Sequence, residues 1–376
     1  MDTDRSAGEH PVTLFLSGDV MTGRGIDQIL PHPGDPFIDE PWMTSAQDYV
    51  DLAEAASGPI PRRVSPDYIW GDGLAVLDRV GPDLRIINLE TAVTTHDRHW
   101  PRKGIQYRMH PANIDCIKAA GIDCCVLANN HVMDWRREGL EETLRVLDGA
   151  GLTHVGAGLD REQACAPVFF PLPGGGRLLI FALGSPTSGV PPEWSATEDR
   201  SGVCFLNDLS QRLAEQVSAA IRAYRQPGDR VLISLHWGGN WGYWVPDEQR
   251  AFARALIEAG AVDGVHAHSS HHPRGIEVYR DRPILYGCGD LLNDYEGIQG
   301  YERYRDDLSL MYFLTLDANT GQLLRLRMAP MQIRQFRLNR ASDEDARWLR
   351  DTLDEEGGRF GTGMSLDGEG MLCLDW

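Results

Sequence analysis

Side chains that can bind a metal ion recur at the ends of short apolar runs in this chain of 376 residues. In chain order they are Asp19, Asn88 with Glu90, Asn129 to His131, and His236, and four histidines follow between positions 266 and 272. Carboxylate, amide oxygen and imidazole are typical ligands of a divalent metal ion, and no thiolate stands at these positions. The residue types therefore predict a metal site and argue against an iron–sulfur cluster or a structural zinc site.

The apolar runs themselves predict buried strands. Each is apolar for four to six residues before it becomes polar or glycine-rich, and they cover residues 12–20, 84–91, 123–131, 177–185, 230–238, 262–269 and 283–290. Helical spacing of apolar residues, with caps and stops, predicts helices at 137–151, 208–229 and 246–260. Alternating strands and helices predict an α/β protein, and in open α/β sheets ligands bind at the carboxyl ends of the strands.

Two segments interrupt this alternation. Residues 31–73, rich in proline, glycine and acids, are predicted to be an insertion, and residues 186–207 a long loop of the kind that often binds substrate. An antiparallel hairpin is predicted from residue 308. The predicted organisation is a polar tail (1–11), one catalytic domain containing both insertions (12–340), and a C-terminal helix and tail (341–376).

Composition restricts the partners and the compartment. A formal net charge of −19 argues against nucleic acid or an anionic membrane surface as a partner. The polar first residues do not resemble a signal peptide, and no apolar run approaches the ~18 residues of a membrane span. Seven cysteines without a CxxC pair, with Cys116, Cys125 and Cys288 in apolar runs, predict buried reduced thiols, no disulfide framework and a cytoplasmic location.

Five motifs that span roughly residues 12–295 resemble a known family. They are "GDVMTGR", "NLET", "LANNHVMDWRREGLEETL", "SLHWG" and "DGVHAHSSHHPRGIEVY", the last followed by "PILYGCGD". In this order they are similar to the motifs of the CapA (poly-γ-glutamate capsule) family, which is related to the calcineurin-like metallophosphoesterases. The resemblance implies a four-layer α/β/β/α sandwich of the metallo-dependent phosphatase type, with a metal site, often dinuclear, at the carboxyl ends of the strands.

The resemblance also implies roles for individual residues. The implied metal ligands are Asp19, Glu90, Asn130, His236, His268 and His271. His131 is implied to face the substrate as an acid or electrostatic stabiliser. Met21 stands where the phosphoesterases have a ligand histidine, which weakens one metal position because a thioether binds a hard dication poorly. The metal remains open among Zn, Mn, Fe and Ca, and no organic cofactor is implied.

Other residues are candidates for contacts with a substrate. Asn88 is one, and Arg24 could bind a carboxylate or phosphate, although a salt bridge with a neighbouring acid is an equal alternative. The segment 236–244, "HWGGNWGYW", predicts either core packing or an aromatic wall for a peptide, formed by Trp237, Trp241 and Trp244. His266 is predicted to pack in the core, and His272 receives no role.

Three functions are compatible with these residues. The preferred prediction is peptide epimerisation, as in family members that invert a residue of ribosomal peptides such as lasso-peptide precursors. There the metal polarises a peptide carbonyl, and Asp19, His131 and either His271 or His268 are the candidates that exchange the Cα proton. The first alternative is metal-dependent hydrolysis of a polyglutamate-type amide or of a phosphoester, and the second is a capsule-assembly protein without catalysis. A peptide substrate is predicted, whereas the oligomeric state is left open.

Overall fold

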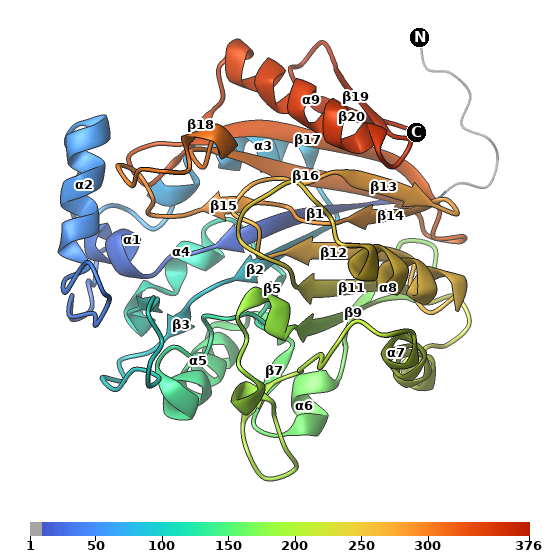
Figure 1. Ribbon diagram of the computed structural model, residues 1–376, viewed down its shortest axis with the longest axis horizontal. Coiled ribbons are helices and arrows are strands. Elements are labelled where there is room, and N and C mark those ends of the chain that lie inside the picture. The colour runs from blue at the N-terminus through green and yellow to red at the C-terminus, as the bar shows by residue number, and fades with distance from the viewer. Residues whose placement is uncertain (1–9) are drawn as a thin grey trace.

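Two β-sheets pack face to face in the computed structural model, which describes residues 10–376 (Figure 1). The larger sheet contains, in spatial order, β19 (Gly363–Leu366), β20 (Leu372–Asp375), β17 (Leu323–Ile333), β16 (Leu308–Asp317), β1 (Pro11–Val20), β2 (Leu84–Leu89), β5 (Cys124–Val126) and β6 (Thr153–Val155). β15 (Asp290–Leu292) pairs with β1, and β18 (Leu338–Arg340) pairs with β17. The smaller sheet contains β13 (Ile276–Tyr279), β14 (Arg282–Leu285), β12 (Gly264–His268), β11 (Arg230–His236), β9 (Arg177–Gly184) and β8 (Val168–Pro171).

Each sheet has a parallel centre, as the predicted alternation of strands and helices requires. β1, β2, β5 and β6 run parallel in the larger sheet, and β9, β11, β12 and β14 run parallel in the smaller one. The register places Asp19 beside Asn88, and His236 beside His268. Two short ladders stand apart from the sheets: β3 (Ala92–Val93) with β4 (Arg108–Met109), and β7 (Ala157–Gly158) with β10 (Gly202–Val203).

Helices cover the outer face of each sheet and complete four layers (Figure 1). Along β1, Leu14 and Leu16 point into the core between the sheets while Phe15 points to the outer core, as the two-residue period of a strand dictates. The helices beside the larger sheet are α1 (Arg24–Ile29), α2 (Gln47–Ser57), α3 (Asp72–Val80), α4 (Asp115–Lys118) and α5 (Arg136–Ala150). Those beside the smaller sheet are α6 (Arg161–Cys165), α7 (Gln211–Tyr224) and α8 (Asp247–Glu258). The predicted α/β/β/α sandwich is confirmed.

The segment after residue 340 belongs to the larger sheet. α9 (Asp343–Gly358) buries Leu349 and Leu353 in the core between the sheets. β19 and β20 then extend the sheet beyond β17, so the prediction of a tail after this helix is wrong. Alternate residues of these two strands, Met364, Leu372 and Leu374, pack in the core between the sheets. None of the helices within residues 10–376 is long and apolar enough to cross a membrane.

Both predicted insertions contain short ordered elements. The segment 31–73 holds α2 and a 3₁₀ turn, Tyr68–Trp70, and the Trp70 indole donates to the carbonyl of Cys116. The segment 186–207 holds two 3₁₀ turns, Pro186–Ser188 and Pro192–Trp194, together with β10. Further 3₁₀ turns are Pro111–Asn113 and Glu302–Tyr304.

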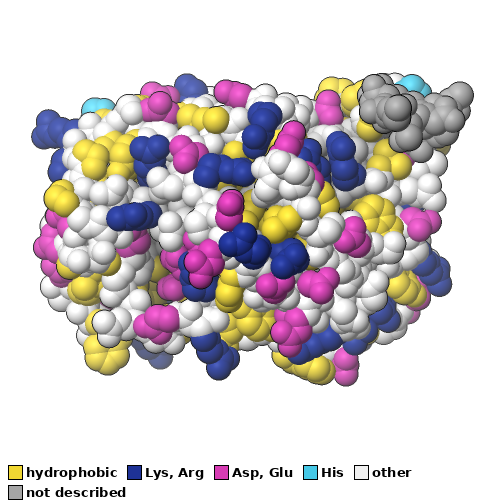
Figure 2. Space-filling view, turned by 90° about the horizontal axis from the view of Figure 1, so that it is seen from above, with side chains coloured by type: hydrophobic (Ala, Val, Ile, Leu, Met, Phe, Trp, Pro, Cys, Tyr) yellow, Lys and Arg dark blue, Asp and Glu magenta, His cyan; other side chains and the backbone are white. Residues whose placement is uncertain are grey.

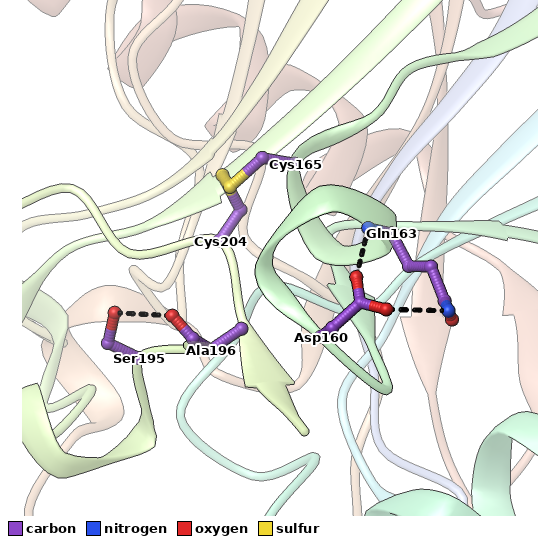
Figure 3. The surroundings of a disulfide bond; sticks show 6 residues. All are labelled: Asp160, Gln163, Cys165, Ser195, Ala196 and Cys204. Carbon is purple, nitrogen blue, oxygen red and sulfur yellow. Dashed lines mark hydrogen bonds between the residues drawn. A yellow bond between two sulfur atoms is a disulfide. The ribbon is translucent and has the colours of Figure 1, made fainter. Parts of the chain in front are cut away.

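A disulfide joins Cys165, at the end of α6, to Cys204, just after β10 (Figure 3). The sequence predicted no disulfide framework, and the structure contains this one disulfide, which was not anticipated. The two cysteines are 39 positions apart, and tertiary contacts that include the β7–β10 ladder bring their Cα atoms to 5.0 Å. Cys116, Cys125 and Cys288 are free and buried, as predicted. Because disulfides persist mainly in oxidising compartments, the cysteines no longer support a cytoplasmic location.

Removing this disulfide should destabilise the fold without disturbing the metal-binding residues, none of which touches it. Cys165→Ser combined with Cys204→Ser should lower the free energy of unfolding by roughly 2–4 kcal/mol, because the open chain gains entropy in the unfolded state. Urea denaturation followed by circular dichroism measures this change. Cys373→Ser, which alters a free thiol, is the control, and equal stability of all three proteins would contradict a structural role for the bond.

Candidate metal centre

Asp19 belongs to two groups of side chains, each of which could hold a metal ion. One group is Asp19, His236 and His268, and the other is Asp19, His271 and Asp290. Within each group the potential ligand atoms lie within 4.8 Å of one another, and all five residues are buried. The larger sheet supplies the aspartates, and the smaller sheet with the turn after it supplies the histidines. The strand ends predicted to meet do lie together.

The first group is linked by short imidazole contacts. His236 Nδ1 and His268 Nδ1 are 2.8 Å apart, and His268 Nε2 lies 2.8 Å from the Ser234 hydroxyl. The other nitrogen of His236, Nε2, lies 3.0 Å from Asn130 Oδ1 and 3.9 Å from Glu90 Oε1. Asn130 and Glu90 therefore stand on the same side of His236 as oxygen donors. His236 therefore contacts His268 through one ring nitrogen and lies near Asn130 and Glu90 through the other.

The second group contains a residue that the sequence analysis missed. Asp290 Oδ1 lies 2.9 Å from His271 Nδ1, and the Asn293 amide donates to the other carboxylate oxygen at 2.8 Å. The parallel pairing of β15 with β1 places Asp290 beside Asp19. The sequence feature that could have identified Asp290 is its place at the end of the apolar run 283–290, because the other predicted strands also end in polar residues. Asp290 supplies a carboxylate on the side where Met21 offers only a thioether.

The approach of β15 to β1 depends on a glycine. A Cβ atom at Gly18 would lie 1.6 Å from the carbonyl oxygen of Gly289, far inside van der Waals contact. The Asp19 amide donates to that same carbonyl at 3.0 Å. The missing side chain at position 18 therefore lets Asp290 reach Asp19.

The electrostatics of the centre favour a bound cation. Burial, with the charge of Asp290, raises the pKa of Asp19 to about 7, and burial with the charge of Asp19 raises the pKa of Glu90 well above its usual range. Burial lowers the pKa of His236 and His268 well below the ordinary value, so both imidazoles are neutral and can act as ligands. A divalent ion would stabilise the ionised carboxylates, and buried carboxylates with neutral imidazoles and an amide oxygen are a donor set that fits such an ion.

Asn88 orients the carboxylates and does not reach a substrate. Its amide nitrogen donates to Asp19 Oδ1 at 2.8 Å and to Glu90 Oε2 at 2.9 Å, and its oxygen accepts from Asn129 at 3.0 Å. The side chain is fully buried. The prediction of a substrate contact at Asn88 is corrected to a positioning role.

His131 faces the centre with one nitrogen and is held by the other. Its Nδ1 lies 2.6 Å from Asp134 Oδ2, and its Nε2 lies 3.8 Å from Glu90 Oε1. Burial lowers the pKa of His131 to about 4, despite the raising effect of Asp134. Lys103 Nζ lies 3.1 Å from Asp134 Oδ1 and 3.4 Å from His131 Nδ1. Neither Asp134 nor Lys103 is among the site residues predicted from the sequence, and Lys103 comes from an irregular loop.

Arg24 is part of a buried ion network instead of a substrate contact. Its guanidinium bonds Asp294 at 2.5 Å and Glu40 at 3.3 Å, and lies 3.8 Å from the centroid of the Tyr49 ring. The salt-bridge alternative is therefore the correct one for Arg24. His266 is also structural: it contacts the carbonyl of Ser17 at 2.8 Å, in agreement with the predicted packing role.

The predicted aromatic wall is reduced to one tryptophan. Trp237 is 1% exposed and packs in the core against Phe252 and Tyr286, so its assignment to substrate binding is wrong. Trp241 alone adjoins the centre: its ring centroid lies 5.3 Å from that of His271 and 4.1 Å from that of Tyr301, on which it stacks. Trp244 is 65% exposed and makes no ring contact with the residues of the centre. His272 stacks on Tyr304 and also packs structurally.

Comparison with known proteins identifies relatives of this chain. Residues 13–295 match the family described as bacterial capsule synthesis protein PGA_cap. A probable polyglutamine synthesis accessory protein of Mycobacterium tuberculosis is 46% identical over 351 residues, which cover 93% of this chain and 92% of the relative. The PGA biosynthesis protein CapA of Bacillus subtilis is 27% identical, with 85% of this chain and 70% of that protein covered. A solved phosphatase of Mycoplasma pneumoniae covers 86% of this chain and 94% of its own at a TM-score of 0.48 and 13% identity, a likeness too low to add to the assignment.

The four layers, with a buried cluster of carboxylates and imidazoles at the strand ends, define a protein with the metallophosphatase type of fold and a candidate site for a divalent metal ion. Within that class, the extent of the sequence match identifies the group. The chain belongs to the bacterial capsule synthesis protein PGA_cap family.

Removing Asp290 should reduce the metal content selectively. Asp290→Ala leaves the group of Asp19, His236 and His268 intact, so the divalent metal bound per chain should fall to about half of the wild-type value. Inductively coupled plasma mass spectrometry of protein purified with added Mn²⁺ or Zn²⁺ measures it. Asp306→Asn, which removes a nearby carboxylate outside both groups, is the control, and unchanged metal content in Asp290→Ala would exclude this residue as a ligand.

Proposed function

We propose that this protein is a metal-dependent hydrolase that cleaves amide bonds in a glutamate polymer. The observation that carries the proposal is the convergence of two potential metal groups, which share Asp19, with the free Nε2 nitrogen of His131. Two adjoining metal positions beside a proton-transfer group are the arrangement of hydrolytic centres. The names of the relatives, which refer to polyglutamine and PGA synthesis, support a glutamate polymer as the substrate class.

Peptide epimerisation, which the sequence favoured, receives no support from these relatives. The burial of Trp237 in the core also removes one of the three tryptophans of the predicted aromatic wall for a peptide. Hydrolysis requires fewer catalytic groups from the protein than epimerisation does. It needs one activated water, one polarised carbonyl and one proton carrier.

The ligands proposed for the metal are the two groups that share Asp19, together with Glu90 and Asn130. A divalent metal bound there would polarise the amide carbonyl and lower the pKa of an attacking water. Asn88 keeps Asp19 and Glu90 in fixed orientations, because its single amide nitrogen bonds both carboxylates. The site is thus preorganised by the protein before any substrate arrives.

His131 is the proposed proton carrier. Asp134 accepts the Nδ1 hydrogen, which fixes the tautomer that leaves Nε2 able to take a proton from water. As the water oxygen bonds to the carbonyl carbon and the carbon–nitrogen bond breaks, the same proton passes from His131 to the leaving nitrogen. The positive charge that forms transiently on the imidazole is stabilised by Asp134.

The entrance to the centre offers contacts for an acidic chain. Lys103 is a cation whose side chain is 14% exposed and lies next to His131. Trp241 and Tyr301 form a flat aromatic stack beside His271 that can accommodate an amide plane. Lys103 is the positively charged member of these groups, and it also pairs with Asp134.

Hydrolysis can be tested directly with oligoglutamate of defined length and linkage. Protein supplied with Mn²⁺ or Zn²⁺ should produce shorter fragments detectable by mass spectrometry, and EDTA, Asp19→Ala or His236→Ala should abolish the products. The reaction is run in deuterated water. Deuterium at Cα without cleavage would refute hydrolysis in favour of epimerisation, and absence of both signals would favour an assembly role without catalysis.

The role of His131 as a proton carrier can be tested separately from metal binding. His131→Ala should lower kcat by about 10²–10⁴-fold while the metal content stays at the wild-type level, because the imidazole transfers a proton and is not among the ligands. Asp134→Asn should lower kcat in the same direction through the wrong tautomer. His154→Ala, on the surface beside Asp148, is the control. A normal kcat in His131→Ala would exclude it as the proton carrier.

A further inference from the structure

Five arginines gather at the end of the molecule remote from the metal centre. Two adjoining clefts of about 320 Å³ and about 540 Å³ share Arg225, Arg230 and Gly260 as lining residues. We call this region the arginine trough, and its arginines are Arg222, Arg225, Arg230, Arg280 and Arg282. They come from the end of α7, the start of β11 and the β13–β14 hairpin, which lie on the right of Figure 1.

The trough and the centre occupy opposite ends of the same strand. β11 begins at Arg230 and ends at His236, so these residues are about 20 Å apart at ~3.3 Å per residue. The arginines therefore cannot serve as ligands or as contacts for the bond that is cleaved. Any ligand that these arginines bind therefore occupies a site separate from the metal centre.

Such a concentration of positive charge is unusual for this chain, which has 36 Lys and Arg residues against 55 Asp and Glu. On the face shown in Figure 2, basic and acidic side chains are interspersed. In the trough the lining acids are Asp229 and Asp263. Asp229 also pairs with Arg177 at 2.5 Å, and Glu258 lies 3.5 Å from Arg280. The lining itself therefore carries five positive and two negative side chains, an excess of positive charge.

Most hydrogen bonds of these arginines go to backbone carbonyls. Arg222 bonds Ala259, Arg225 bonds Gly260, and Arg230 bonds Ala318. Asp263 pairs with Arg225 at 2.9 Å and with Arg282 at 3.6 Å. A carbonyl oxygen satisfies a donor but carries no full negative charge, so the guanidinium charges of Arg222 and Arg230 remain to act on the clefts. Within the described residues, Arg282 Nη1 is buried without a hydrogen-bond partner. The trough thus keeps both charge and donor capacity for an anion.

We propose that the arginine trough is a second binding site, which takes a linear chain of carboxylates. The proposal rests on the proposed function for the identity of the polymer, whereas the site itself is defined by its charge and shape. A single small anion would occupy one cleft, but two adjoining clefts that share Arg225 and Arg230 fit successive anionic groups along one chain. Guanidinium groups recognise carboxylates through paired hydrogen bonds. The trough would hold a long polymer at a distance from the bond that is cleaved.

The arginines also have a structural use, which the test must separate from binding. Arg222 and Arg225 bond carbonyls at the end of α8, where positive charge stabilises a helix terminus. Arg230 anchors the β16–β17 turn and is itself buried. Arg222 and Arg280 are exposed and make the fewest bonds, so they can be changed with least effect on the fold.

The test measures binding of fluorescently labelled decaglutamate to the full-length protein by anisotropy, in EDTA so that no cleavage occurs. Arg222→Glu with Arg280→Glu should raise Kd roughly tenfold or more, because two attractions become repulsions. The matched control, Arg63→Glu with Arg359→Glu, changes the net charge equally at exposed positions outside the trough and should leave Kd within about twofold. Added salt should weaken wild-type binding more steeply than that of the trough variant.

Two further measurements make the result decisive. Cleavage of a short amide substrate, which is too short to span the distance to the trough, should be unchanged in the trough variant, and this also shows that the variant is folded. Asp19→Ala should lose cleavage but keep decaglutamate binding, so failure of the proposed reaction and failure of the trough are distinguishable. Equal Kd values for the trough variant and its control, no binding of decaglutamate by the wild type, or tighter binding of polyphosphate than of decaglutamate would each overturn the proposal.

Discussion

Three carboxylates, those of Asp19, Glu90 and Asp290, lie together where water barely reaches them, since each is at most 1% exposed. Ionised groups of one sign in such surroundings repel one another strongly and lose their hydration. The protein nevertheless holds them in place through strand pairing and through the bonds of Asn88. A bound cation would compensate this negative charge. Most other features of the centre place potential ligands where such a cation would bind.

The two sheets divide this task between them. The larger sheet supplies the carboxylates and amides, and the smaller sheet supplies the imidazoles of His236 and His268. The apolar core between the sheets sets their separation, and a shift in that core would move the oxygen ligands relative to the nitrogen ligands. This explains why a domain of this size is needed to place a handful of ligands: the geometry of the centre depends on packing along the full length of both sheets.

The sequence predicted long, regular features well and short or irregular ones poorly. Asp19 and His236 end strands of ten and seven residues, whose apolar runs are unmistakable. Asp290 begins a strand of three residues after a Gly-Cys-Gly turn, a segment too short to show periodicity. Lys103 lies in an irregular loop, and its contact with Asp134 depends on tertiary structure alone.

The sequence alone also did not distinguish the roles of neighbouring residues of the same type. Trp237 and Trp241 belong to one aromatic segment, yet only the fold shows that the first enters the core and the second borders the centre. Likewise, the choice between a substrate and a salt bridge for Arg24 required the position of Asp294, 270 residues away. Pairing across such separations leaves no local pattern in the sequence, and the Cys165–Cys204 bond was missed for the same reason.

The close approach of β15 to β1 at Gly18 has an evolutionary consequence. Any side chain at this position would push Gly289 away and carry the neighbouring acid out of reach of its partner. Substitutions at positions 18 and 290 are therefore expected to covary among homologues. A larger residue at position 18 is compatible with a metal centre only where another residue replaces the carboxylate of Asp290.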